Sequence, residues 1–152
     1  RTFLKLSPPL RTEEDRIALV KGLSDGTIDV IVSDHKPEDE EKKRLTFAQA
    51  ETGASGIETL LSLSLEHYHN GSVKLETIIK ALTSNPAKIL KINKGTLSVG
   101  RDADFCIVDL NKPWIVKQEN LHSKSKNTSI QNKKLQGKVI NTFVKGEELF
   151  KL

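Results

Sequence analysis

The chain has 152 residues, of which 36% are hydrophobic and 29% are charged, and its net charge is +4. This composition is typical of a globular protein, and it excludes a membrane span because no apolar run approaches the roughly 18 residues that a spanning helix needs. Aromatic residues make up only 5% of the chain, too few for a surface that stacks nucleobases. We therefore expect neither a nucleic-acid partner nor a membrane partner.

The N-terminal third predicts a helix followed by a buried strand. Residues 2 to 6 are apolar and strand-like, and residues 12 to 23 are expected to form a helix that Thr12 caps and Asp25-Gly26 ends. The next stretch, TIDVIVS at residues 27 to 33, is apolar on both faces, which is typical of a strand buried on both sides in a parallel sheet. A helix, a tight turn and such a strand make half of a βαβ unit.

The middle of the chain predicts a long loop and then three helices. Residues 35 to 56 are charged and contain glycine, so we expect a loop with one short helical turn. Apolar residues then recur at helical spacing from residue 57 to Tyr68 and from Leu75 to Leu82. In SNPAKIL, Pro86 is expected at the first position of a short helix that Ser84 or Asn85 caps.

After residue 91 apolar and polar residues alternate between glycine turns, which favours short antiparallel strands. The sequence therefore predicts an α/β segment at residues 1–91 and a β segment at residues 92–152. Cys106, the single cysteine, lies in the apolar stretch FCIVDL, and we expect it to be a buried thiol. A chain that cannot form an internal disulfide fits a reducing cytoplasm. Because it begins with Arg1 and has no methionine, we also expect it to be a piece of a longer protein.

Asp34 is the first candidate for chemistry, because it follows the predicted strand at the end where parallel α/β folds place catalytic groups. Its carboxylate can bind a divalent metal or carry a proton, or it can simply cap the next turn. His35 is expected to point to the opposite side of an extended backbone. His67 and His69 lie about 200° apart on a helix, so we interpret them as surface histidines rather than as metal ligands.

Six segments in this order resemble the C-terminal part of a dihydroorotase of the amidohydrolase superfamily. The segments are KLSPPLRTEEDR, DGTIDVIVSDHKPEDEEKKR, GASGIETLL, LTSNPAKIL, GTLSVGRDADFCIVDL and SKSKNT. The resemblance implies that residues 1–91 are the last units of a (β/α)8 barrel. Residues 92–152 would complete a small β-sandwich.

The resemblance also implies a zinc-dependent hydrolysis of a cyclic amide, in which dihydroorotate and N-carbamoyl-L-aspartate interconvert. Asp34 matches the family's aspartate that binds metal and moves the proton from the attacking hydroxide to the departing nitrogen. The other metal ligands would lie upstream of Arg1. Since a catalytic zinc needs about three protein ligands, we expect the 152-residue chain alone to be inactive, and poorly folded unless it associates.

Three departures from the family pattern fall on residues expected to bind substrate. Ser7 stands where the family has asparagine, Glu38 where it has a second histidine, and Thr52-Gly53 where it has Phe-Gly. An acidic Glu38 would repel an anionic substrate unless Lys36 or a cation compensates. Two alternatives therefore stay open: an inactive dihydroorotase-like partner of aspartate carbamoyltransferase, and a hydrolase of another cyclic amide such as a hydantoin. A homo-oligomer is expected in either case.

Overall fold

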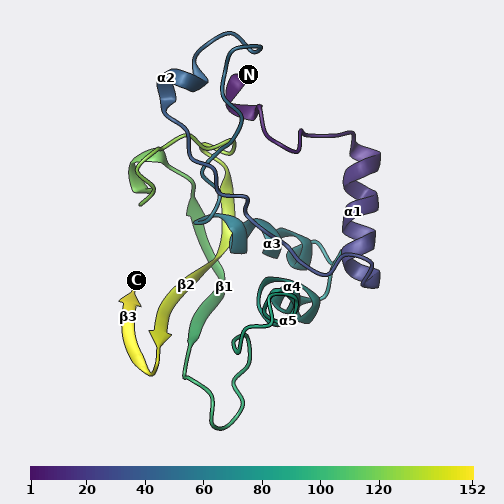
Figure 1. Cartoon of the computed structure of the whole chain (residues 1–152), viewed down its shortest axis with the longest axis vertical. Coiled ribbons are helices and arrows are strands. Elements are labelled where there is room, and N and C mark those ends of the chain that lie inside the picture. Colours follow the sequence, from purple (N-terminus) through teal and green to yellow (C-terminus); the bar gives the residue numbers. More distant parts are fainter.

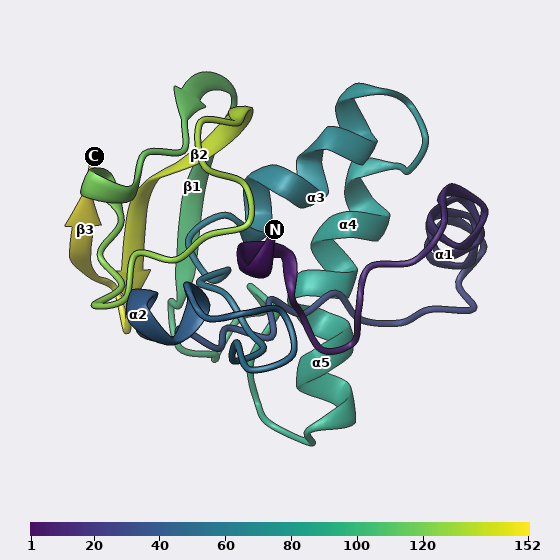
Figure 2. The ribbon, with the colours of Figure 1, turned by 90° about the horizontal axis from the view of Figure 1, so that it is seen from above.

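The computed structural model describes residues 1–152 as an α/β arrangement with one small antiparallel sheet. Figure 2 shows the sheet on one side, helices α3 (Leu60–His69), α4 (Leu75–Leu82) and α5 (Ser84–Ile89) in the middle, and α1 (Glu13–Asp25) on the opposite side. In Figure 1 the loop that carries the short helix α2 (Glu40–Lys43) lies beside the N-terminus. None of these helices combines the length and the apolar character needed to cross a membrane.

Helix α1 begins and ends where the sequence predicts. The Thr12 hydroxyl accepts a hydrogen bond from the Asp15 N–H, and the Asp15 carboxylate accepts one from the Thr12 N–H at 3.1 Å, which satisfies two donors at the helix start. The helix ends at Gly26, which has a left-handed backbone conformation. Only Leu23 of this helix is buried, whereas the apolar side chain of Ile17 is 55% exposed.

The predicted strands at residues 2–6 and 27–33 are both wrong. Residues Thr2–Leu4 form a 3-10 helix, and residues 27–33 belong to no sheet. A strand needs a hydrogen-bonded neighbour, and the backbone of the second segment is instead bonded to helices. The Ile31 N–H donates to the Ala81 carbonyl at 3.1 Å, and the Asn85 amide donates to the Asp29 carbonyl at 2.9 Å. The segment is therefore a connector lying against α4 and α5.

A small core holds this connector to the helices. Leu23, Val73, Ile78 and Ala81 are buried together, and Ile31 packs against them from the connector. Val32, the next residue, is 71% exposed, so the two faces of the connector have different environments. The prediction that this apolar run is buried on both faces therefore holds on one face only.

Helix α4 follows the predicted spacing, whereas α3 begins at Leu60 and leaves Ile57 outside the helix and 60% exposed. Helix α5 also differs at its start. It begins at Ser84 after Thr83, so Pro86 is its third residue and not its first. The N–H groups of the first helical turn have no partner within the helix, so the proline removes no helical bond there. Neither predicted cap acts as one, because Ser84 and Asn85 are themselves helical.

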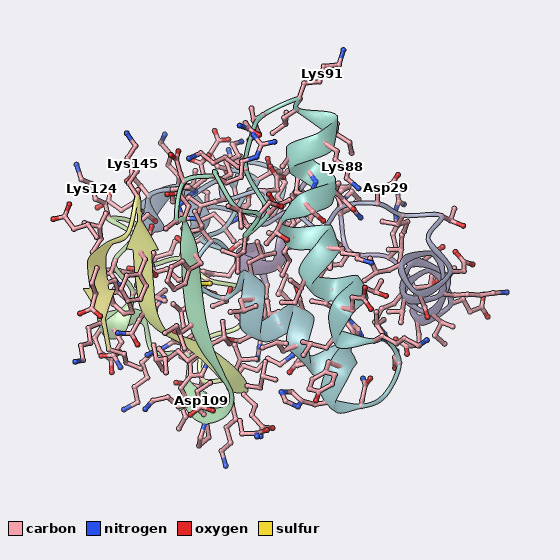
Figure 3. All side chains as sticks on the ribbon, turned by 90° about the horizontal axis from the view of Figure 1, so that it is seen from below. Asp29, Lys88, Lys91, Asp109, Lys124 and Lys145 are labelled. Atoms are coloured by element: carbon pink, nitrogen blue, oxygen red, sulfur yellow. The ribbon has the colours of Figure 1, made fainter.

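The C-terminal segment forms the predicted antiparallel strands, β1 (Phe105–Ile115), β2 (Lys134–Val144) and β3 (Glu147–Lys151), in that order across the sheet. Cys106 is exposed, so its predicted burial is wrong. It lies on β1, whose residues are largely open to solvent because the helices cover only part of the sheet. In Figure 3 Lys124 and Lys145 project on the sheet side, while Lys91 projects from the end of α5.

Helix α3 packs directly on β2 at Gly137, where the absence of a side chain leaves room for Leu65. A Cβ atom at this position would stand 2.4 Å from Cδ1 of the buried Leu65. The Ser62 hydroxyl donates to the Gly137 carbonyl at 2.6 Å and accepts from the Trp114 indole N–H at 3.1 Å. The sheet and the helix are thus joined by both packing and hydrogen bonds.

Candidate functional site

A pocket of about 250 Å³ lies between the connector, the N-terminal turn and the start of α3. Three of the candidate residues line it, although they are far apart in the sequence: Ser7, Asp34 and Gly53. Thr52 and Glu38, the other two candidates for substrate binding, are not among its lining residues. The remaining wall consists of Leu6, Pro8, Val32, Ser33, Ala54, Ser55, Gly56, Thr59, Leu60, Leu63, Ser129 and Ile130.

Asp34 has an uncommon backbone conformation, with a φ of +41°. Aspartate tolerates this left-handed region better than most residues, yet it is still strained, and such strain tends to gather at functional sites. The next side chain, His35, does not enter the pocket wall, since its Nδ1 accepts hydrogen bonds from the N–H groups of Gly56 and Ile57 at 3.1 and 3.3 Å. His35 is thus held away from the pocket that Asp34 lines, although the backbone at Asp34 is not the extended one on which that prediction relied.

Gly53 is fixed against the segment that follows Asp34. Its φ is +132°, and a Cβ atom would stand 2.5 Å from the Lys36 carbonyl oxygen, so only glycine fits here. The Lys36 N–H donates to the Ala54 carbonyl at 3.1 Å. The loop at residues 52–56 and the loop at residues 34–38 are consequently in direct contact across the pocket wall.

Two lysines hold the loop that leads to Gly53. The buried Lys43 ammonium donates to the carbonyls of Lys5, Glu51 and Gly53 at 3.0, 2.8 and 2.9 Å. Burial lowers the pKa of Lys43 below its ordinary value, and the nearby Glu38 carboxylate opposes this effect. Lys5 in turn donates to the carbonyls of Phe47, Ala48 and Ala50 at distances of 2.8, 3.1 and 2.7 Å.

The negative charge of Glu38 is compensated by Lys36. Its carboxylate lies 3.4 Å from the Lys36 ammonium, and its side chain is only 15% exposed. A carboxylate paired in this way repels an anion less than a free one does. Glu38 is nevertheless not among the residues that line the pocket.

His122, which has no partner evident in the sequence, contacts Glu58 just before α3. The Glu58 carboxylate accepts from the His122 N–H at 2.9 Å and from the Ser123 N–H at 3.0 Å, and it lies 3.0 Å from the His122 Nδ1. Partial burial acts to raise the pKa of Glu58, but these hydrogen bonds outweigh it and leave the pKa lowered. The Glu58 carboxylate therefore holds residues 122–123 against the turn that precedes α3.

The residues of this chain do not form a metal centre by themselves. No three histidine, cysteine, aspartate or glutamate side chains are grouped as a metal would require. His67, predicted to be a surface residue, has an Nδ1 that is buried without a hydrogen-bond partner, and burial lowers its pKa. Asp34 can supply one carboxylate ligand, whereas a catalytic zinc needs about three ligands from protein.

Comparison with known proteins assigns this chain to a family. The model of the amidohydrolase family matches residues 6–149, and this chain belongs to that family. A dihydroorotase from Anaplasma phagocytophilum (strain HZ) is 43% identical over 150 residues, which make up 99% of this chain and 34% of that protein. A dihydroorotase from Wolbachia sp. subsp. Drosophila simulans (strain wRi) is 44% identical over 146 residues, 96% of this chain.

Solved structures agree on the fold. The L-hydantoinase (dihydropyrimidinase) from Arthrobacter aurescens superposes with a TM-score of 0.91 at 33% identity, covering 99% of this chain and 35% of that one. The dihydropyrimidinase from Brevibacillus agri NCHU1002 also gives a TM-score of 0.91, at 24% identity. This chain spans about a third of the length of the curated relatives that it matches.

Two of the residues that shape the site are not evident from the sequence. Lys43 lies in the run KKR, where nothing distinguishes the buried lysine from its exposed neighbours. Asn127 lies in SKSKN, which reads as a polar basic loop, yet it is 1% exposed. A polar residue reveals burial only through its partners, and those partners lie far away in the chain.

Proposed function

We propose that this chain is part of an enzyme that hydrolyses a cyclic amide, interconverting dihydroorotate and N-carbamoyl-L-aspartate in pyrimidine biosynthesis. One observation carries the proposal: the three positions Ser7, Asp34 and Gly53, which correspond to dihydroorotase site positions although Ser7 differs in residue type, line one pocket. The identity of 43–44% to dihydroorotases supports it. In the longer protein, residues 1–91 would belong to a (β/α)8 barrel and residues 92–152 to a β-sandwich, and we place the enzyme in the cytoplasm.

Asp34 is the residue of this chain that would move the proton. In hydrolysis the oxygen of water bonds to the carbonyl carbon, the ring C–N bond breaks, and the nitrogen gains a proton. A carboxylate at the pocket wall can accept the proton of the attacking water and return it to that nitrogen. Ser7 and Gly53, which line the pocket, would position the ring. Thr52, which precedes Gly53, and Glu38, paired with Lys36, lie outside the lining and would act from beside the substrate.

Zinc would supply the activated water in such an enzyme, and Asp34 is the ligand that this chain offers. Because its other carboxylates and histidines are not grouped, the remaining ligands would come from the longer protein. The 152-residue chain by itself should therefore bind zinc weakly and show no turnover of dihydroorotate. Turnover by the purified chain would contradict this assignment of the ligands.

The test is the substitution Asp34→Asn in the full-length protein, with Asp29→Asn as the matched control in the same connector. Asparagine keeps the shape but cannot accept and return a proton, so kcat for dihydroorotate should fall about 100- to 10,000-fold. The control should keep the kcat of the unmodified enzyme. Full activity in the Asp34 variant would refute the role of this carboxylate.

Two other functions are favoured by specific observations. The 33% identity to an L-hydantoinase supports a hydantoin or dihydropyrimidine as the ring, and steady-state assays with both rings would decide between the substrates. Ser7 and Glu38, which depart from the family pattern, favour an inactive subunit that assembles with aspartate carbamoyltransferase or with itself. The double variant Ser7→Asn, Glu38→His should lower KM for dihydroorotate if the site is catalytic, and it should change nothing in an inactive subunit.

A further inference from the structure

Asn127 lies where three separate segments meet, and it is 1% exposed. Its Oδ1 accepts from the Glu38 N–H at 3.2 Å, and its Nδ2 donates to the Gly53 carbonyl at 3.3 Å. Its own backbone carbonyl accepts from the Ser55 N–H at 2.8 Å. One side chain thus bridges the loop that follows Asp34 and the loop that carries Gly53.

The neighbours of Asn127 strengthen this connection. The Ser125 hydroxyl lies within hydrogen-bond distance of both the Glu38 carbonyl and the Asn127 Oδ1, and its single proton serves one of them at a time. The Ser55 hydroxyl donates to the Ser125 carbonyl at 2.8 Å and lies 3.1 Å from the Ser123 hydroxyl. Each of these contacts joins residues that are more than 60 positions apart, except that between residues 125 and 127.

Asn127 is also close to the pocket in sequence, since Ser129 and Ile130 form part of the pocket wall. The segment at residues 122–127 therefore contacts three segments that each contribute residues to the wall: the turn before α3 through Glu58, the Gly53 loop, and the Asp34 loop through Glu38. A buried amide is costly unless both its ends are paired, and here both are. No other amide side chain in the chain reaches both loops.

From this geometry we infer that Asn127 is a positioning residue for the reaction, which sets the distance between Asp34 and the Gly53 loop without touching the substrate. The inference rests on the proposed function for its catalytic consequence, but the bridge itself is independent of it. Asn127→Asp keeps the size and the acceptor, and it replaces the donor to Gly53 with an oxygen that repels the carbonyl. The Gly53 carbonyl keeps its bond from Lys43, so the fold retains a support.

The experiment compares Asn127→Asp and Asn127→Ala with the exposed Asn120→Asp in the full-length protein. Amide hydrogen exchange at Glu38 and Lys36 should accelerate at least tenfold in both Asn127 variants and stay unchanged in the control. With dihydroorotate, kcat should fall about 100-fold, because small displacements of a catalytic group cost that much. Each variant should keep a cooperative thermal unfolding transition in the full-length protein, and this separates positioning from simple loss of structure.

Each result has a distinct meaning. Unchanged exchange at Glu38 overturns the bridge, whatever the activity. Faster exchange with unchanged kcat and KM overturns the role in the reaction. If the unmodified enzyme turns over no dihydroorotate, the proposed function fails, and the exchange rates still decide whether Asn127 couples the two loops.

Discussion

Replacing Lys43 with methionine is expected to loosen the loop at residues 44–53, because methionine fills a similar volume but donates no hydrogen bond. Three carbonyls lose the ammonium, namely those of Lys5, Glu51 and Gly53. The Lys5 carbonyl keeps the Gly53 N–H, and the Gly53 carbonyl keeps the Asn127 amide. Only the Glu51 carbonyl is left without the donor that the structure gives it.

The size of the effect follows from these contacts. Leaving one acceptor unpaired costs about 1–3 kcal/mol, and each weakened carbonyl adds about 0.5–1.5 kcal/mol. Removing a buried charge offsets part of this loss, because the charged ammonium is costly to desolvate. We expect a net loss of about 2–4 kcal/mol in the free energy of opening this loop.

Native-state hydrogen exchange in the full-length protein measures that opening directly. At about 1.4 kcal/mol for each factor of ten, the amides of Glu51 and Gly53 should exchange roughly 30- to 700-fold faster in Lys43→Met. The exposed neighbour gives the matched control, Lys42→Met. Exchange in the Lys43 variant within about threefold of that control would refute the argument that the ammonium organises the loop.

Two further predictions concern Glu58 and Thr12. Glu58→Gln should destabilise the packing of residues 122–123 on α3 by about 1–2 kcal/mol, because a neutral amide accepts more weakly from the His122 N–H. Since the folded pKa of Glu58 is lowered from 4.5, its contribution is present above pH 4.5 and is lost as pH falls through the folded value. Urea unfolding at pH 7 and at successively lower pH measures the free energy of unfolding of the unmodified protein and of Glu58→Gln. The difference between the two should shrink as pH falls, and a pH-independent difference would contradict the assignment. Thr12→Ala should destabilise α1 by about 1 kcal/mol, seen as faster exchange of the Asp15 amide, whereas a substitution at the exposed, unpaired Glu14 should leave it unchanged.

The sequence predicts best the elements that depend on local chemistry. The cap at Thr12 and the helical spacing from Leu75 to Leu82 need only neighbours in the chain, and both are confirmed. The apolar run at residues 27–33 is equally clear as a pattern, but a strand also requires a neighbour, and this chain provides helices there instead. Cys106 fails for the same reason, because burial depends on what covers β1.

The candidate site shows the same division between features that depend on local sequence and features that depend on distant contacts. Resemblance to a family points to Ser7, Asp34 and Gly53, and these three line one pocket. The side chains that fix the loops around them, Lys43 and Asn127, act through backbone groups 8 to 89 positions away. Contacts with a carbonyl or an N–H carry no signature in the sequence of the partner, because every residue has these groups.

The close approach of α3 to β2 at Gly137 links the sheet to the pocket wall. The strands of the sheet contribute no residue to the pocket, but α3 carries Leu60 and Leu63 in its wall and rests on Gly137 through Leu65. A single methyl group added at Gly137 would push Leu65 away and move that wall with it. On the function proposed above, variants selected to accept bulkier or smaller cyclic amides should therefore include changes at Gly137 and Leu65 as well as changes around Asp34.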